Sequence, residues 1–214
     1  MQRVNIYGFP HKGIRNALGQ LSFKLGGLDG NQTDQVTEVV DQTEEISELL
    51  KLHLHSEETH VLPPVEAKVP GSTEHNHDDH EAMEALEHQM VEKVRHLHED
   101  ASPAAVTAAY DQVNIFIKEY FRHMEEEETD VNEVIWANFE DQEILSWQGK
   151  ILSEFTPDQF FKWFKYIIPA LQPHEQQIML GGFKSNAPAE AYQATIQNLK
   201  PYLSDTQFAF IQTI

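Results

Sequence analysis

Four short segments pair a histidine with a charged residue four positions later, a spacing that places both side chains on one face of an α-helix. The segments are HKGIR at His11–Arg15, HLHSEE at His53–Glu58, HNHDDHE around His77–Glu81, and HMEEEE at His123–Glu128. Imidazole and carboxylate groups are ligands for transition metals such as iron. A single pair arises easily by chance in a chain with 12 histidines and 35 acidic residues, so the argument needs their relative positions.

The chain predicts four long amphipathic helices. The first ends at Gly26–Gly27, the second stops at Pro63–Pro64, the third follows Pro70–Gly71 with Ser72 or Thr73 as N-cap, and the fourth follows Ser102–Pro103. Their apolar stripes comprise Ile14, Leu18, Leu21 and Leu25; Val36, Val39, Ile46, Leu49 and Leu50; Met83, Leu86, Met90, Val94 and Leu97; and Val106, Tyr110, Val113, Ile117, Tyr120 and Met124.

These helices predict an all-α fold, an antiparallel up-down-up-down four-helix bundle over residues 1–148. Residues 149–214 are expected to form a helical extension, cut by prolines, that packs on the bundle or at a subunit interface. Its aromatic run FFKWFKYII is expected to be core. The sequence leaves the oligomeric state open.

The four histidine segments fall at one end of this bundle. His11 lies near the start of the first helix, and His77 and His80 lie near the start of the third. His53 and Glu57 lie near the end of the second helix, and His123 and Glu127 near the end of the fourth. Alternating helix directions bring these positions to the same level. His53 and Glu57 continue the apolar stripe of the second helix, and His123 and Glu127 continue that of the fourth. A buried carboxylate is costly unless it is paired or bound to a metal.

The residues therefore favour a metal centre over a buried His–Glu hydrogen-bond network, which is the alternative. Five histidines and two glutamates exceed the four ligands of a typical zinc site. They suit two ions bridged by the carboxylates. We expect an iron pair, with dimanganese, mixed metals or zinc as the other possibilities.

HKGIR, HLHSEE, the histidine-rich third segment and HMEEEE make the chain similar to hemerythrin-like (HHE cation-binding) domains over about residues 5–145. The resemblance implies a four-helix bundle with a non-haem di-iron site whose two ions share an oxo or hydroxo bridge. By the same resemblance, the ligands would be His11, His53, Glu57, His123 and Glu127, with the two glutamates as bridges.

The third helix matches less closely, because it offers His75, His77 and His80. We expect His77 as the first choice of ligand and His80 as the second, and the spacing leaves open whether one or both bind metal. Arg15 could pair with a carboxylate near the site such as Glu58, or it could be an ordinary surface arginine. The remaining histidines are expected to face solvent: His55, His60, His75, His88, His96, His98 and His174.

Composition excludes several functions. The net charge of −20 disfavours nucleic acid and anionic membrane surfaces as partners, and the lack of cysteine excludes disulfides and thiolate metal sites. No signal peptide or membrane span is visible, so we expect a soluble cytoplasmic protein.

Two functions remain, and the first is favoured. A histidine-rich di-iron centre with few carboxylates suits binding or sensing of O2, or of iron, nitric oxide or peroxide. The alternative is a di-iron oxidoreductase that reduces peroxide or nitric oxide with an external electron donor, but no cofactor-binding motif is present. A purely structural metal site is a third possibility.

Overall fold

The computed structural model describes residues 3–214, apart from the side chain of His77, and every regular element in that range is helical. The described residues form two compact units. The first comprises the chain up to Gly8 and from Ala17 to Glu154, and the second comprises Phe9–Asn16 and Phe155–Ile214. Among the described residues, no helix is both long enough and apolar enough to cross a bilayer.

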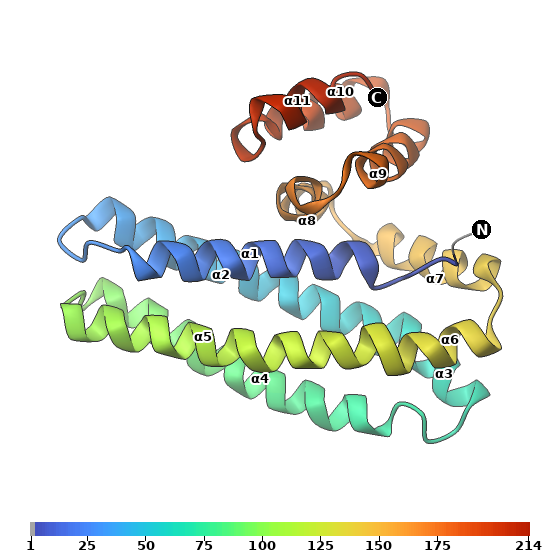
Figure 1. Ribbon diagram of the computed structural model, residues 1–214, viewed down its shortest axis with the longest axis horizontal. Coiled ribbons are helices and arrows are strands. Elements are labelled where there is room, and N and C mark those ends of the chain that lie inside the picture. Colours follow the sequence, from blue (N-terminus) through green and yellow to red (C-terminus); the bar gives the residue numbers. More distant parts are fainter. Residues whose placement is uncertain (1–2) are drawn as a thin grey trace. The chain divides into compact units, whose positions relative to one another are not determined.

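Four long helices lie side by side, and they confirm the predicted four-helix bundle (Figure 1). They are α1 (Gly8–Gly26), α2 (Thr33–Ser56), α4 (Glu74–Arg95, extended by the 3-10 turn η2 at His96–His98) and α5 (Pro103–Glu126). The stripes predicted for the first two helices are buried as expected, because they form the bundle core. Ser102 caps α5 through a hydrogen bond that its hydroxyl accepts from the Ala105 backbone N–H.

The predicted inner face of α5 needs one correction, because Tyr110 is 37% exposed. The buried side of α5 passes through Ala109, Val113, Phe116 and Tyr120 instead. A Cβ added at Gly26 of α1 would lie only 3.3 Å from the Tyr110 ring. The ring thus lies across a residue without a side chain, at the edge of the bundle, with part of its surface in solvent.

The second helix does not stop at the Pro63–Pro64 pair, contrary to the sequence prediction. It passes through a π-helical turn, η1 (Glu57–Val61), into α3 (Leu62–Lys68), and both prolines lie in the first turn of α3. Proline is tolerated there because the first N–H groups of a helix have no intrahelical partner. The fourth helix does the same through η3 (Glu127–Val131) into α6 (Asn132–Asn138). Single π-turns of this kind often mark functional sites.

An apolar cluster closes the end of the bundle beyond these π-turns, where α7 (Asp141–Glu154) joins α3 and α6. The cluster comprises Tyr7, Val61, Leu62, Val65, Val131, Ile135, Phe139, Ile144 and Trp147. Arg3 holds the N-terminal segment against it, with Nε 2.5 Å from Asp141 Oδ1 and Nη2 donating to the Phe139 carbonyl oxygen at 2.6 Å. We call this cluster the apolar cap.

The second unit contains α8 (Pro157–Ala170), α9 (Pro173–Asn186), α10 (Ala189–Asn198), the 3-10 turn η4 (Lys200–Tyr202) and α11 (Asp205–Ile211). The aromatic run is largely core, as expected, since Trp163, Phe164 and Tyr166 are buried. Within this unit, Lys12 Nζ lies 2.5 Å from Glu175 Oε1, and the Asn16 amide donates to the Tyr166 carbonyl oxygen at 2.9 Å.

Candidate metal centre

Six of the seven predicted ligand residues lie in two overlapping groups of buried side chains. One group contains His11, His53, Glu57 and Glu127, and the other contains Glu57, His80, His123 and Glu127. In each group, one potential ligand atom of every member lies within 4.8 Å of the others. All six residues are 5% exposed or less. The groups share both carboxylates, so together they suggest a binuclear metal site. The side chain of His77 lies outside the described part of the chain.

Helix α2 and the first turn of α1 supply the histidines of the first group. His53 and Glu57 are four residues apart and lie on the same face, with His53 Nε2 3.1 Å from Glu57 Oε1. His11 is fully buried. The helical register therefore delivers an imidazole and a carboxylate to one point, as their sequence spacing predicts.

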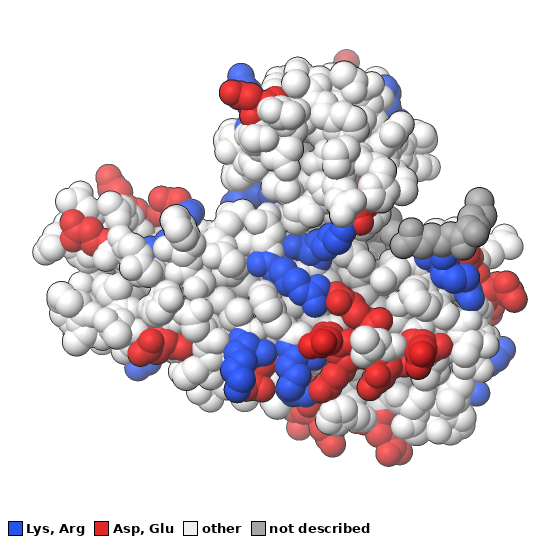
Figure 2. Space-filling view, in the orientation of Figure 1, with Lys and Arg blue, Asp and Glu red and all other residues white. Residues whose placement is uncertain are grey.

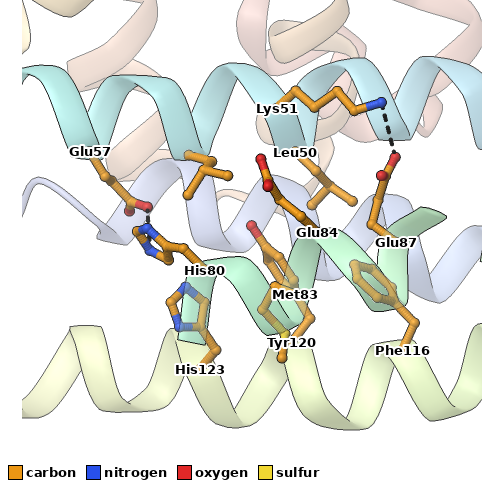
Figure 3. A pocket seen from close by; sticks show the side chains of 11 residues that line it. Leu50, Lys51, Glu57, His80, Met83, Glu84, Glu87, Phe116, Tyr120 and His123 are labelled. Atoms are coloured by element: carbon orange, nitrogen blue, oxygen red, sulfur yellow. Dashed lines mark ion pairs between the residues drawn. The ribbon is translucent and has the colours of Figure 1, made fainter. Parts of the chain in front are cut away.

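The potential ligand atoms of the second group lie farther apart than His53 and Glu57 do in the first. His80 Nε2 lies 3.8 Å from Glu57 Oε2 and 3.7 Å from Glu127 Oε1, and His123 Nε2 lies 3.5 Å from Glu127 Oε1. Figure 3 shows His80 and His123 next to one another, with Glu57 facing His80. Two ligand atoms each about 2.1 Å from one ion lie about 3.0–3.4 Å apart at tetrahedral or octahedral angles. The donor set and its spacing therefore fit a cation between these side chains.

The other ring nitrogen of each histidine in the second group faces a carboxylate. His80 Nδ1 lies 3.3 Å from Glu58 Oε1, and His123 Nδ1 lies 3.9 Å from Asp79 Oδ2. Glu58 is within hydrogen-bond distance, so it can hold the proton on His80 Nδ1 and leave the Nε2 lone pair for an ion, whereas Asp79 is too far from His123 Nδ1 for a direct hydrogen bond. Glu58 thus has His80 as a partner, and its proposed pairing with Arg15 stays a prediction.

The carboxylates give the centre a negative potential. Burial and the nearby charge of Glu127 raise the pKa of Glu57 well above its ordinary value of 4.5. Burial also raises the pKa of Tyr7 and of Tyr120, and the charges of Glu57 and Glu127 add to both shifts. Two buried carboxylates this close disfavour each other's ionised form, and a bound cation would offset that cost.

A third group of ligand-type side chains, His75, Asp79 and Glu126, lies at the surface. Arg122 already neutralises it, with Nη1 2.5 Å from Glu126 Oε1 and Nη2 3.5 Å from Asp79 Oδ2. Figure 2 shows Lys and Arg side chains beside Asp and Glu side chains over α5. A guanidinium in that position makes the group a salt-bridge network.

The histidines predicted to face solvent do so, with one exception. His60 is half-buried, and its Nε2 lies 2.8 Å from Glu154 Oε1 of α7. The exposed ones are His55, His75, His88, His96, His98 and His174.

Sequence reasoning missed three features around the centre: the two π-turns, the contacts of Glu58 with His80 and of Asp79 with His123, and Tyr7 in the apolar cap. The π-turns have a signal in the sequence, since Glu57 begins EETHV and Glu127 begins EETDV. Both segments are π-helical, and in each the first residue, a glutamate, and the last, a valine, are buried. The repeat marks equivalent positions in the two halves of the bundle.

The comparisons with known proteins agree with this geometry. Residues 5–135 match the hemerythrin HHE cation binding domain, a range that contains all of the buried histidines and glutamates described above. Searches of curated proteins and of solved structures each gave no match. The match covers more than half of the chain, which therefore belongs to the hemerythrin HHE cation-binding domain family.

Proposed function

We propose that this chain binds two iron ions and uses them to bind or sense O2 or another small molecule such as nitric oxide or peroxide. One ion would be held by His11 and His53, the other by His80 and His123, with Glu57 and Glu127 bridging both. His77 remains a candidate for an additional ligand on the second ion. The observation that supports this proposal is the sharing of two buried carboxylates by two histidine groups.

Iron is the metal that we favour because the site combines imidazoles with carboxylates and offers more ligands than a structural zinc site needs. Four imidazoles against two carboxylates make the set poor in anionic ligands. Fewer anionic ligands stabilise high-valent iron less, so reversible ligand binding is favoured over oxidation of an organic substrate. Manganese would satisfy the same ligand types, and metal analysis distinguishes the two.

The first test is metal analysis of the chain produced with iron available. We expect two irons per chain, and charge-transfer absorption after anaerobic ferrous loading and exposure to air. Bands that reverse under vacuum support binding. Continuous consumption of peroxide with an added reductant would favour the oxidoreductase, and one zinc per chain would overturn both functions.

Variants test the residue assignment. Glu57→Ala and Glu127→Ala should each lower the iron content, because each removes a carboxylate that both ions share. His55→Ala is the matched control, since His55 is an exposed histidine two residues before Glu57. Equal iron loss in all three variants would contradict the assignment.

A further inference from the structure

His11 differs from the other candidate ligands in the part of the chain with which it packs. Of the six ligand residues that the structure describes, His11 alone lies in the second compact unit, in the segment Phe9–Asn16. The same unit contains α8–α11, and none of the described ligand groups includes a residue of these helices. The C-terminal helices therefore pack with the part of α1 that carries a ligand, although they supply no ligand themselves.

The turn of α1 that carries His11 is a weak helix by itself. His11 is the fourth residue of α1, which begins GFPHKG. Asn5 caps the start, because its Oδ1 accepts a hydrogen bond from the Gly8 N–H at 3.0 Å. Gly8 and Gly13 both lower helix stability relative to alanine, and the first N–H groups of a helix have no intrahelical partner. The position of His11 therefore depends on what packs against this turn.

Helix α8 touches the backbone of this turn at Gly13. A Cβ added at Gly13 would lie 2.5 Å from Ile167 Cγ1 and 3.4 Å from the Ile167 Cα and N atoms. Ile167 is buried and β-branched, so it has little freedom to move aside. A Cβ added at Gly19, further along α1, would meet nothing within 4 Å. The close approach is therefore a feature of Gly13 and not of every glycine in this helix.

Two polar contacts hold the same turn on either side of Gly13. Lys12 Nζ lies 2.5 and 2.7 Å from the two carboxylate oxygens of Glu175 in α9. The Glu175 carboxylate is itself fixed, because it also accepts a hydrogen bond from the Gln172 N–H at 2.9 Å. The Asn16 amide donates to the Tyr166 carbonyl oxygen of α8 at 2.9 Å. The turn after His11 is thus held at three positions by α8 and α9.

Helices α8 and α9 are joined firmly to each other. The Gln176 side chain is 1% exposed, and its amide donates to the Ile168 carbonyl oxygen at 2.8 Å. The rings of Phe164 and Phe183 pack edge to face, with centroids 5.1 Å apart. Because the two helices are linked in this way, a displacement of the α1 turn acts on both of them together.

We propose that α8–α11 respond to the metal state of the centre, because they hold the turn of α1 that presents His11. This inference rests on the proposed function, since it takes the centre to bind iron. Coupling between two equilibria is reciprocal. The packing of α8 and α9 on the turn raises the iron affinity, and iron raises the population of the packed state by the same factor. Loss of iron therefore loosens the C-terminal helices, which gives residues 155–214 a role in reporting the metal state.

The first test compares Gly13→Ala with the matched control Gly19→Ala. Both variants replace a glycine of α1 by alanine and gain the same helix propensity, but only Gly13→Ala places a methyl group against Ile167. Such overpacking should weaken iron binding about 5-fold or more in the full chain, measured by competition with a chelator. Gly19→Ala should bind iron as the wild type does. Far-ultraviolet circular dichroism checks that both variants fold.

The second test uses the ion pair between Lys12 and Glu175. Lys12→Met keeps the length of the side chain and removes its charge, so it should weaken iron binding by about 2- to 5-fold, the effect of one partly exposed ion pair. Lys12→Arg should restore the affinity. Glu175→Gln should match Lys12→Met, and the two changes combined should cost no more than either alone, since both break one contact. Effects that add would indicate general destabilisation and contradict the inference.

The third test measures the reverse effect, that of iron on the C-terminal helices. Trypsin cleaves after lysine, and Lys162, Lys165 and Lys184 lie in α8 and α9. In the wild type, iron loading should slow cleavage at these residues relative to chelator-treated protein, as followed by mass spectrometry. Gly13→Ala should lose most of this protection, whereas Gly19→Ala should keep it.

The outcomes separate this inference from the proposed function. Equal iron affinities of Gly13→Ala and Gly19→Ala would overturn the inference, as would cleavage of α8 and α9 at the same rate with and without iron in the wild type. In either case the proposed function stands if the chain still holds two irons. A wild-type chain that binds no metal would overturn the proposed function, and this inference with it.

Discussion

Replacing Glu57 by glutamine should change the stability of this protein in opposite directions with and without metal. Glu57 is 3% exposed, and its neighbour Glu127 is fully buried. In the metal-free chain, glutamine removes a charge that burial disfavours, and its amide can donate to Glu127. Relieving one poorly satisfied buried polar group contributes about 1–3 kcal/mol, so we expect Glu57→Gln to be about 2 kcal/mol more stable than wild type.

With metal present, the order should reverse. A ligand at about 1,000 times its dissociation constant stabilises the folded state by about 4 kcal/mol per site. Glu57→Gln loses a shared ligand and should forfeit most of this gain, which leaves it about 2 kcal/mol or more below the wild type. For a chain of this size, 1 kcal/mol corresponds to about 2–4 °C in Tm, so each difference should be about 4–8 °C.

The assay is thermal unfolding of chelator-treated and iron-loaded protein, with metal content measured on the same samples. Glu125→Gln is the matched control, because Glu125 is exposed and two residues from Glu127. It should stay within about 0.5 kcal/mol of wild type in both states. A metal-free Glu57→Gln that is less stable than metal-free wild type would refute the reasoning about buried charge. Full iron occupancy in this variant would refute the bridging role.

Three further predictions concern pH, the orientation of His80, and the metal. Burial lowers the pKa of His80, but Glu127 and Glu58 outweigh burial and raise it above 6.5, while the pKa of Glu57 is raised above 4.5. A group whose pKa is raised in the folded state stabilises the fold at low pH, and this stability is lost as the pH rises. The Tm of the metal-free chain should therefore decrease as the pH is raised from about 5 to about 8. An unchanged or rising Tm would contradict these shifts. Glu58→Ala should reduce iron affinity about 10-fold or more by releasing the orientation of His80, whereas exposed Asp78→Ala should leave the affinity measured by competition with a chelator unchanged. Chelation should lower the Tm but leave the far-ultraviolet circular dichroism helical, and collapse to a coil would instead favour a structural metal site.

The sequence predicts most of the fold because the apolar period is unambiguous in the long helices. Ile46 and Leu49 are buried as their spacing requires. Which face of α5 is buried was harder to predict, because Val113 and Tyr120 lie both on the predicted face with Tyr110 and on the observed face with Ala109 and Phe116. Only the packing of the neighbouring helices shows that Tyr110 lies toward solvent. The Pro63–Pro64 pair predicts a stop only if the preceding turn is α-helical, and here that turn is π-helical.

The candidate site follows from spacing for the two His-x-x-x-Glu pairs, because four residues define one helix face. The third helix offers histidines three apart, and periodicity alone does not rank His77 and His80. The structure brings His80 into the second group. The contact of His80 with Glu58 joins residues 22 positions apart, so it depends on how the helices pack, which no local pattern encodes.

The repeated π-turns divide the centre between two helical hairpins. His53 and Glu57 belong to the hairpin of α1 and α2, whereas His80, His123 and Glu127 belong to the hairpin of α4 and α5. Each hairpin supplies the imidazoles of its own group, but both groups need the glutamate of the other hairpin. Bound ions would therefore link the two hairpins non-covalently. If the chain is cleaved in the loop at 69–73, between α3 and α4, the two fragments should stay associated for as long as metal is bound.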